Sequence, residues 1–446
     1  MHVAFSRPIG TLLESRVIEF EGIKTTVEYR ALGSSVKVYL NDQVSHGISL
    51  IDPFYVEELV SLGAPLSRAV EKALVAKGKA SLVEEGVRVM SRFMEYYGAL
   101  TPIIMNSDVT DIYLYEDAIL VNSAKYGLCS VSIDNVAVQR PRGLLRGVES
   151  RVLTIRDLVN HVVKQVIRRT RTPITSYMPM ASVVDHEFKA RFSISIPPIS
   201  SQFIHIRMLP REPWTLPAMV GLNMIDANHA AALWRLMDDK IPILIVGPMG
   251  SGKTSLANAI AFMTKPTALK VLIMDVDEMH LPNHLVVKLI ERKSYGLGVK
   301  PITKDELIAH ALRMGADYII VNEVREAPEA KAWLNAVNTG HGGVTTFHAE
   351  DYKALIDRMS ILVPNSEAMV ARVTVVVTDM RLMPINVNGV RLFRKFRYVK
   401  DIVMPPEANE VIKMGRDDVE YRRDIILSLM NAPPDQVLSA VMKVYG

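Results

Sequence analysis

The pattern of apolar and polar positions changes several times along the 446 residues of the chain. Residues 1 to about 50 alternate apolar and polar side chains between glycines, which predicts short strands. Between Pro53 and Gly98 the apolar residues recur instead with the 3.6-residue period of a helix, at Leu82, Val83, Val87, Met90, Met94 and Tyr97. We therefore expect residues 1–99 to form an N-terminal extension of short strands followed by helices.

Residues 100–207 mix both patterns and predict a compact α+β domain. A helix is expected after Thr154, because Thr154 and Asp157 have the spacing of a capping box. The last turns of this helix carry four cations, Lys164, Arg168, Arg169 and Arg171. These cations either contact the phosphates of a nucleotide or nucleic acid, or they simply favour the negative C-terminal end of the helix dipole. Strands are expected at residues 111–115, 118–122 and 128–131.

Two further arginines mark the ends of neighbouring strand patterns. Arg191 begins the pattern of residues 191–198, and Arg207 ends that of residues 203–207. A hairpin would place both arginines at one end of a sheet. The prolines that follow, Pro210, Pro213 and Pro217, lead us to interpret residues 208–222 as a semi-rigid linker between domains.

From residue 223 to residue 446 apolar strands alternate with helices, the pattern of a parallel α/β sheet. The strand at residues 243–246 is followed by Gly247, four residues, and then Gly252, Lys253 and Thr254, and a helical pattern starts at Leu256. This is the phosphate-loop motif in the strand-loop-helix context that it requires. A glycine-rich turn that binds nothing is the alternative, and the flanking strand and helix make it the weaker interpretation.

The residue types of this loop fit phosphate binding. Glycines let successive backbone N–H groups curve around an anion, and the N-terminus of the following helix attracts that anion. Lys253 can reach the β- and γ-phosphates, and the Thr254 hydroxyl can bind Mg²⁺. The nucleotide is therefore expected to contact Gly247, Pro248, Met249, Gly250, Ser251, Gly252, Lys253, Thr254 and Ser255.

Acidic residues end two later strands. The strand at residues 270–275 ends in Asp275, with Asp277 and Glu278 close behind, and the strand that begins at Asp317 ends at Glu323. Ligands of α/β sheets lie at the C-terminal ends of the strands. These acids can therefore hold Mg²⁺ or activate an attacking water, whereas without the phosphate loop they would be interpreted as solvated turns.

Residues 338–349 contain His341 and His348 together with three glycines and three threonines, Thr345 and Thr346 among them. Their spacing predicts a tight loop that senses a phosphate. Metal binding by the two histidines is the weaker alternative, because no third protein ligand accompanies them.

The C-terminal stretch predicts a basic strand at residues 390–397 and helices over the last 30 residues, with a break at Pro433 and Pro434. The basic strand either contacts a nucleotide, an acidic partner or anionic lipid, or it is a solvated edge strand protected by its charge.

Composition narrows the class of protein without identifying it. Lys and Arg number 52 against 48 Asp and Glu, so charge alone does not indicate a nucleic-acid binder. The single cysteine, Cys129, excludes an internal disulfide and a multi-cysteine zinc site. No apolar run reaches the roughly 20 residues that span a bilayer, so we expect a soluble protein, and the single cysteine fits a reducing cytoplasm.

The order of these motifs resembles the type II/IV secretion ATPase superfamily, which includes type II secretion ATPases and the motors of type IV pili and archaella. The phosphate loop, the acids after residue 274, the Glu-x-Arg at Glu323 and the His341–His348 stretch carry the resemblance. Glu278-Met-His-Leu-Pro282 is similar to the archaeal-type acidic box. The resemblance implies a RecA-like ATPase domain at residues 223–446, including the C-terminal helices, preceded by a separate α+β domain.

The resemblance also implies roles for single residues. Glu278 would activate water, and Glu323 would hold Mg²⁺ together with Thr254. His341 and His348 would couple the state of the γ-phosphate to subunit movement, and Arg191 and Arg207 would reach the nucleotide across an interdomain cleft. The chain departs from the family pattern twice: Met274 occupies an acidic position, and Asn322 stands where glycine is usual.

The implied function is that of an ATP-hydrolysing homo-hexamer that uses ATP and Mg²⁺. It would power assembly of type IV pilus-like filaments or secretion, through a polytopic platform protein of the membrane and, indirectly, pilin-like subunits. The protein would lie at the cytoplasmic face of the membrane through that partner. Two alternatives stay open: a DNA-transfer ATPase of the same superfamily, the one case with a nucleic-acid partner, and a non-hydrolysing nucleotide-gated scaffold.

Overall fold

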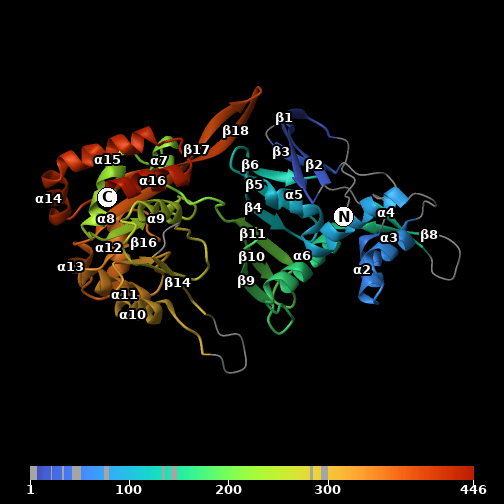
Figure 1. Ribbon diagram of the computed structural model, residues 1–446, viewed down its shortest axis with the longest axis horizontal. Helices are drawn as coiled ribbons and strands as arrows, with labels where there is room; N and C mark the ends of the chain where they lie inside the picture. The colour runs from blue at the N-terminus through green and yellow to red at the C-terminus, as the bar shows by residue number, and fades with distance from the viewer. Residues whose placement is uncertain are drawn as a thin grey trace. The chain divides into compact units, whose positions relative to one another are not determined.

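The computed structural model describes residues 8–445 apart from residues 22, 33–34, 43–51, 75–79, 133–135, 142–147, 282–284 and 293–299. Pro282 of the expected archaeal-type box lies outside the described residues. The chain divides into two compact units (Figure 1). Unit 1 is Met1–Leu209 with Leu382–Lys395, and unit 2 is Pro210–Arg381 with Phe396–Gly446.

Unit 1 is built on one large sheet. Its described residues form nine strands in the order β1-β2-β3-β6-β5-β4-β11-β10-β9. Neighbouring strands are antiparallel except β3 and β6, which are parallel. A separate pair is formed by β7 (Val136–Pro141) and β8 (Val148–Leu153). The strands of the large sheet are β1 (Thr11–Phe20), β2 (Ile23–Leu32), β3 (Ser35–Asp42), β4 (Val109–Leu114), β5 (Ile119–Ser123), β6 (Gly127–Val131), β9 (Met180–Asp185), β10 (Ala190–Ser195) and β11 (Phe203–Met208).

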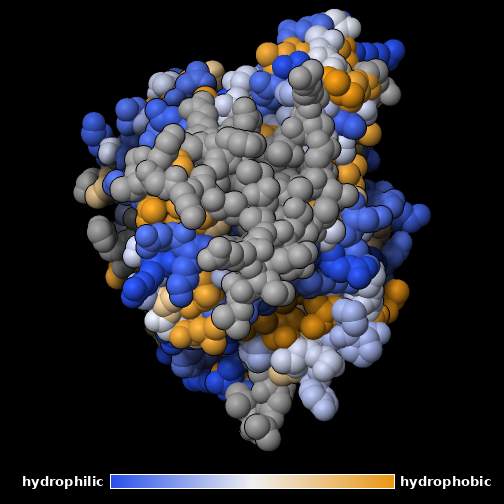
Figure 2. All heavy atoms as spheres, turned by 90° about the vertical axis from the view of Figure 1, so that its right-hand side faces the viewer, coloured by the Kyte–Doolittle hydropathy of each residue, from blue (hydrophilic) through white to orange (hydrophobic). Residues whose placement is uncertain are grey.

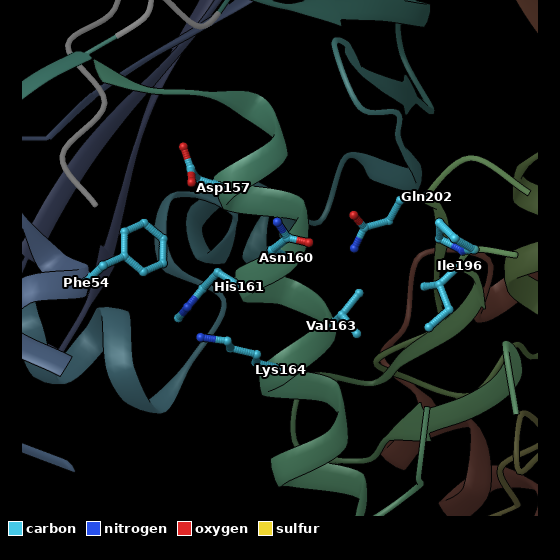
Figure 3. Close-up of a pocket in the computed structure, with 9 residues that line it drawn as sticks. Phe54, Asp157, Asn160, His161, Val163, Lys164, Ile196 and Gln202 are labelled. Atoms are coloured by element: carbon cyan, nitrogen blue, oxygen red, sulfur yellow. The ribbon is translucent and has the colours of Figure 1, made fainter. Parts of the chain in front are cut away.

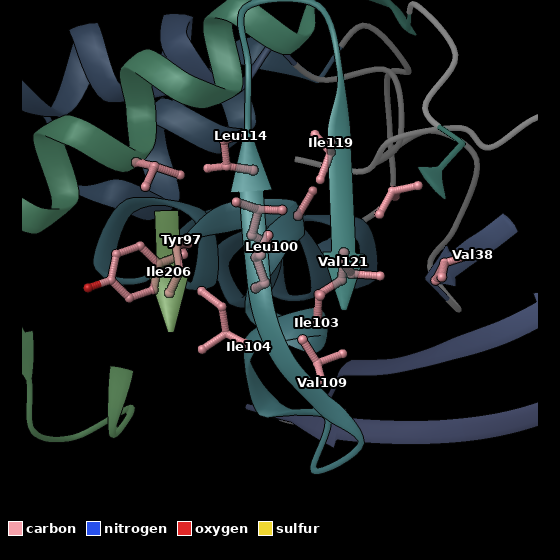
Figure 4. Close-up of a cluster of buried hydrophobic side chains, with 14 of the residues drawn as sticks. Val38, Tyr97, Leu100, Ile103, Ile104, Val109, Leu114, Ile119, Val121 and Ile206 are labelled. Carbon is pink, nitrogen blue, oxygen red and sulfur yellow. The ribbon is translucent and has the colours of Figure 1, made fainter. Parts of the chain in front are cut away.

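Buried residues of the large sheet pack against helices of unit 1. Apolar residues of helix α6 (Ile155–Thr170), among them Leu158 and Val162, share one core with the strands. Figure 4 shows part of that core, where Leu100, Ile103 and Ile104 gather beside β4 and β5. The expected capping box of Thr154 and Asp157 is present. The other helices are α2 (Pro53–Ser61), α3 (Leu66–Ala73), α4 (Ala80–Glu95), η1 (Gly98–Leu100) and α5 (Thr101–Met105).

Arg169 at the end of α6 has a structural partner. Its Nε lies 2.5 Å from Asp185 Oδ2, and one terminal nitrogen lies 2.6 Å from Glu187 Oε2. Its guanidinium also stacks over the rings of Tyr96, Tyr97 and Phe188. These contacts join α6 to the edge of the sheet, so this cation of the helix end is used inside unit 1.

We expect Arg169→Ala to lower the free energy of unfolding of unit 1 by about 3 kcal/mol, because it leaves Asp185, whose side chain is 5% exposed, without its cation. Chemical denaturation followed by fluorescence measures this change. The neighbouring Arg168 is exposed, and Arg168→Ala is the matched control with an expected loss below about 0.5 kcal/mol. Equal effects of the two variants would contradict the structural role of Arg169.

Unit 2 is built on a parallel sheet. Its described strands follow the order β14-β13-β15-β16-β12-β17-β18, and the first six are parallel to their neighbours. The strand before the phosphate loop, β12, therefore lies between β16 and β17. The strands are β12 (Ile243–Val246), β13 (Lys270–Met274), β14 (Val286–Ile290), β15 (Tyr318–Val321), β16 (Gly342–Phe347), β17 (Thr374–Val387) and β18 (Val390–Val403).

Helices cover both faces of this sheet, because its central strands are apolar on both sides. Ile243 and Ile245 of β12 belong to one core, and Leu244 and Val246 belong to the other. The first core includes α7 (Leu216–Gly221), α8 (Ala227–Asp238), α9 (Lys253–Phe262), α14 (Pro406–Met414), α15 (Arg416–Ser428) and α16 (Pro434–Val444). The second includes α10 (Lys304–Arg313), α11 (Ala327–Asn338), α12 (Tyr352–Leu362) and α13 (Glu367–Val370).

The hairpin of β17 and β18 is longer than its apolar pattern predicts. The pattern indicates strands at residues 372–378 and 390–397, whereas the structure extends them to Val387 and Val403. Residues 379–387 are mostly exposed, so no alternation marks them as a strand. Residues of the tip, Leu382–Lys395, belong to unit 1, where Leu392 is buried in the core.

None of the described helices is both long and apolar enough to cross a bilayer. Among the coloured residues of the face in Figure 2, hydrophobic side chains occur in separate groups between hydrophilic ones.

Candidate functional site

The loop between β12 and α9 has a shape that requires its glycines. Gly252 is the N-cap of α9 and has a φ of 90°, in the left-handed region. A Cβ atom added to Gly247 would lie 2.3 Å from the carbonyl oxygen of Thr378. The loop therefore combines left-handed backbone with close approach of β17, as expected for a backbone that curves around an anion.

Lys253 is the central cation of the loop. Its side chain is buried, and Nζ donates to the carbonyl oxygens of Gly247 and Pro248 at 2.9 Å each. Nζ also lies 3.4 Å from Nδ1 of His348. Burial lowers the pKa of Lys253 to about 8, against the opposing effect of the Glu323 charge. The Lys253 ammonium group thus donates to two loop carbonyls. A bound phosphate would take the place of these carbonyls as the acceptor.

The other loop residues divide between anchors and exposed groups. The Oγ of Ser251 lies 2.8 Å from Oγ1 of Thr378, and Arg397 of β18 donates from Nε to the carbonyl of Gly250 at 2.8 Å. Met249 is exposed, and the predicted ligands Pro248, Thr254 and Ser255 are half-buried. Sequence reasoning missed Thr378, which lies about 130 residues further along the chain, and it included Arg397 only in the basic strand at residues 390–397, for which contact with a nucleotide was one interpretation.

Glu323 follows β15 with its side chain 13% exposed. Its Oε2 accepts hydrogen bonds from Nε and NH2 of Arg325 at 2.8 and 2.5 Å. Its Oε1 lies 2.7 Å from Nε2 of His348, yet this buried oxygen receives no aligned hydrogen bond. Burial and the nearby charge of Lys253 lower the pKa of His348, while Glu323 opposes this. Lys253, His348 and Glu323 are therefore joined in one continuous series of contacts.

A buried lysine supports the backbone of Glu323. Lys304, the first residue of α10, donates from Nζ to the carbonyl oxygen of Glu323 at 2.8 Å and lies 3.1 Å from Oε1 of Glu329. Glu329 in turn accepts a hydrogen bond from the backbone N–H of Arg325 at 2.8 Å. No sequence signal marked Lys304 or Glu329, because the contact joins the starts of two helices.

Two of the three acids after β13 reach this cluster. The amide nitrogen of Asn322 donates to Oδ1 of Asp275 at 2.7 Å and to Oε1 of Glu278 at 3.3 Å. The side chain of Asp275 is 6% exposed and also accepts from Arg325 at 3.3 Å. Asp277 is instead paired with Lys288, whose Nζ lies 2.7 Å from Oδ1. Glu278 and Glu323 are thus brought to one end of the sheet.

The prediction of a tight loop at residues 338–349 is wrong. Residues Gly342–Phe347 form the buried strand β16, so His341 and His348 lie at opposite ends of that strand. A strand of this length separates them by about 20 Å. His348 joins Lys253 and Glu323, whereas Nδ1 of His341 lies 3.2 Å from the carbonyl oxygen of Ala336. The apolar positions Val344 and Phe347 complete the two cores, which explains why this glycine-rich stretch is extended.

Arg191 and Arg207 lie in unit 1, on β10 and β11. These two strands form the antiparallel pair that the sequence predicted. The two arginines are directly opposite each other in this pair. Arg191 donates from Nε to Oγ of Ser182 at 3.2 Å, and Arg207 donates from Nε to Oδ1 of Asp111 at 3.2 Å. The side chain of Arg207 is 46% exposed.

A pocket of about 560 Å³ in unit 1 is lined by Lys164 of the basic helix end, but by none of the residues predicted to bind or hydrolyse the nucleotide. Figure 3 shows its wall along α6, from which Asn160, His161 and Lys164 project. The ring of His161 stacks on Phe93 with centroids 3.9 Å apart, and burial lowers its pKa to about 3. His161 is therefore a neutral residue of the core.

The donor sets fit a nucleotide with Mg²⁺. The loop offers backbone N–H groups, the Lys253 ammonium and the N-terminus of α9, which together match a polyphosphate. The unbonded, buried Oε1 of Glu323 and the half-buried hydroxyl of Thr254 are oxygen donors of the kind that Mg²⁺ prefers. Within the described residues, no group of three or more His, Cys, Asp or Glu side chains forms a separate metal cluster.

The lowered pKa of Lys253 predicts a pH-dependent affinity. In the free protein Lys253 is charged below pH 8 and increasingly neutral above it, while bound phosphate favours the charged form. The dissociation constant of ADP should therefore rise at least about tenfold between pH 7.5 and 9.5. Equilibrium titration with ADP in EDTA measures this rise. In Lys253→Arg the side chain stays charged, so a rise of similar size in that variant would contradict the assignment.

Without the edge strand β14, the parallel strands follow one another along the chain as β12, β13, β15, β16 and β17. In the sheet, the first of these, β12, lies between the fourth, β16, and the fifth, β17. With the phosphate loop at its end, this order defines the RecA-like class of α/β proteins and confirms the predicted fold. The chain belongs to the type II/IV secretion system protein family, whose model matches residues 138–404.

The chain is also similar to the following relatives and solved structure. An uncharacterized protein of the archaeon Methanocaldococcus jannaschii is 28% identical over 211 residues, 46% of this chain and 29% of that protein, and supports the archaeal-type branch. Type IV secretion system protein VirB11 of Bartonella quintana is 36% identical over 126 residues, 28% of this chain and 35% of that protein. The X-ray structure of the Legionella pneumophila ATPase DotB has a TM-score of 0.43 at 17% identity, covering 77% and 87% of the two chains. Both sequence matches thus span about a third of the relative's own length.

Proposed function

We propose that this protein is an ATPase that works as a homo-hexameric motor. The contact series of Lys253, His348 and Glu323 carries the proposal, because it joins the phosphate loop to the acid that ends β15. A phosphate that binds Lys253 would change the surroundings of His348 and Glu323 at once. Membership of the secretion family supports ATP as the nucleotide.

Each residue of the site has a role in this proposal. ATP with Mg²⁺ supplies the reactive phosphoanhydride and a divalent charge on its phosphates. Lys253 and the loop N–H groups bind the β- and γ-phosphates, and Thr254 and Glu323 hold the metal. Glu278 orients the attacking water and accepts its proton, because its carboxylate reaches the same end of the sheet.

In the same proposal, Arg191 and Arg207 contact the nucleotide after the two kinds of unit close on each other. Both arginines lie together on the β10–β11 hairpin, and Arg207 is half exposed. We expect them to reach the nucleotide when unit 1 closes on a unit 2, and we expect His341 to respond at a contact between subunits. Closure would exclude water and deliver the power stroke.

The motor would drive assembly of a type IV pilus-like filament, or secretion, at the cytoplasmic face of a membrane. Its direct partner would be a polytopic platform protein, with pilin-like subunits reached indirectly. The family assignment and the VirB11 relative support work in a secretion system.

Affinity capture from native membranes tests this output. A Glu323→Gln variant should hold ATP and stay on its partner, so the eluate should contain a polytopic membrane protein and pilin-like subunits. Lys253→Ala, which should not bind nucleotide, is the matched control and should recover much less. Recovery of DNA-processing proteins alone would support the DNA-transfer alternative and contradict filament assembly.

A further inference from the structure

Asn322 occupies a junction of three strands in unit 2. It follows β15 directly and is 2% exposed. Its backbone N–H donates to the carbonyl of Ile273 in β13 at 3.0 Å, and its carbonyl accepts from Oγ1 of Thr346 in β16 at 2.7 Å. The backbone of Asn322 is therefore fixed from both sides, which fixes the direction of its side chain.

The side-chain amide bridges the acidic residues. Its nitrogen donates to Oδ1 of Asp275 at 2.7 Å and to Oε1 of Glu278 at 3.3 Å, while its oxygen accepts from the backbone N–H of Glu323 at 2.9 Å. The reverse orientation would turn the amide oxygen toward two carboxylates and the NH₂ group toward an N–H. The contacts thus allow one orientation, with the donor group toward the acids.

The amide of Asn322, which stands where the resemblance implies glycine, weakens the repulsion between Asp275 and Glu278. Carboxylates that converge on one point repel each other, unless a neutral or positive donor lies between them. The Asn322 amide donates N–H groups to both Asp275 and Glu278 without adding charge, so it weakens the repulsion between them. Glycine has no side chain to do this.

We propose that Asn322 is a positioning residue that holds Glu278 in place for its work on the attacking water. This inference rests on the proposed ATPase function and adds a residue that the motifs had marked only as a departure. Asn322 touches neither the phosphate loop nor the proposed metal oxygens. It acts through Glu278 and through the backbone of Glu323.

Two substitutions separate positioning from simple packing. Asn322→Ala removes the bridge, and Asn322→Asp keeps the shape but places a third carboxylate at the point where two converge. Both should lower kcat at least about tenfold and change KM for ATP less than about threefold, because the loop that binds phosphate is unchanged. The control Asn106→Ala removes a buried, hydrogen-bonded asparagine of unit 1, and should lower thermal stability while kcat stays within about twofold.

A binding measurement tests the same geometry without turnover. If the two carboxylates converge on the amide nitrogen, Asn322→Asp creates a site of three carboxylates and should bind Mn²⁺ without nucleotide at least about tenfold more tightly than Asn322→Ala. Calorimetric titration with Mn²⁺ alone measures this ratio.

The outcomes are distinguishable. If the wild-type protein hydrolyses ATP and Lys253→Ala does not, but both Asn322 variants keep the wild-type kcat, the proposed function stands and the role of Asn322 is overturned. If the wild-type protein hydrolyses nothing, the proposed function fails. In that case the Mn²⁺ titration still tests the bridging geometry. If Asn322→Asp binds Mn²⁺ less than twofold more tightly than Asn322→Ala, the geometry is overturned, and if it binds Mn²⁺ tenfold more tightly, the geometry is upheld.

Discussion

Replacing Lys253 with alanine should abolish ATP turnover, with kcat/KM reduced at least about a thousandfold. The ammonium group lies within the loop, on the carbonyls of Gly247 and Pro248. Its removal takes away charge both where the phosphates bind and where charge develops during transfer. Steady-state phosphate release from the purified protein measures the loss.

The control for this variant is Lys265→Ala, in the turn after α9, because Lys265 is exposed. It should keep kcat/KM within about twofold, and both variants should keep the wild-type circular dichroism spectrum. Unchanged turnover in Lys253→Ala would show that the activity does not use this loop. Absence of turnover in the wild-type protein would favour the scaffold alternative.

Replacing Glu323 with glutamine should lower kcat about 100- to 1,000-fold while the affinity for ATP stays within about threefold. The change keeps the shape of the side chain but removes the charge that faces Lys253 and His348 and that would hold Mg²⁺. Lys253 and the loop N–H groups stay in place, so ATP still binds. Single-turnover hydrolysis and equilibrium binding of a fluorescent ATP analogue separate the two effects.

The matched control is Glu350→Gln, which neutralises an exposed carboxylate shortly after His348. Its kcat should stay within about twofold of wild type. If Glu323→Gln lost affinity for ATP while kcat stayed unchanged, Glu323 would act in ground-state binding, and the membrane capture described above would need a different trapping variant.

Local pattern was sufficient for most elements around the site. The apolar run before Gly247 became β12, the spacing of Gly252 and Lys253 became the start of α9, and the strand ends at Asp275 and Glu323 meet at one end of the sheet. Arg191 and Arg207 proved to be cross-strand neighbours, as the hairpin pattern predicted. These features depend on residues that are close in sequence, and on the rule that parallel strands share one carboxyl end.

Side-chain partners were less predictable. The glycines around His341 were interpreted as a loop, but pairing with β12 and β15 on both sides makes the stretch a central strand. The basic end of α6 was left open between phosphate binding and a solvated helix end, and Arg169 proved to be paired within the fold. In both cases the competing interaction comes from residues that are distant in sequence.

By itself the sequence determined the class of this protein: a phosphate loop between a strand and a helix, acids at two strand ends, and an α+β region before it. Only the tertiary structure decided which groups meet. It placed His348 between Lys253 and Glu323, separated His341 from them, supported Glu323 with Lys304, and turned Asn322 from a departure into a bridge between two acids. The physical reason is that strand order and register fix such contacts, and these are set by the packing of the whole sheet.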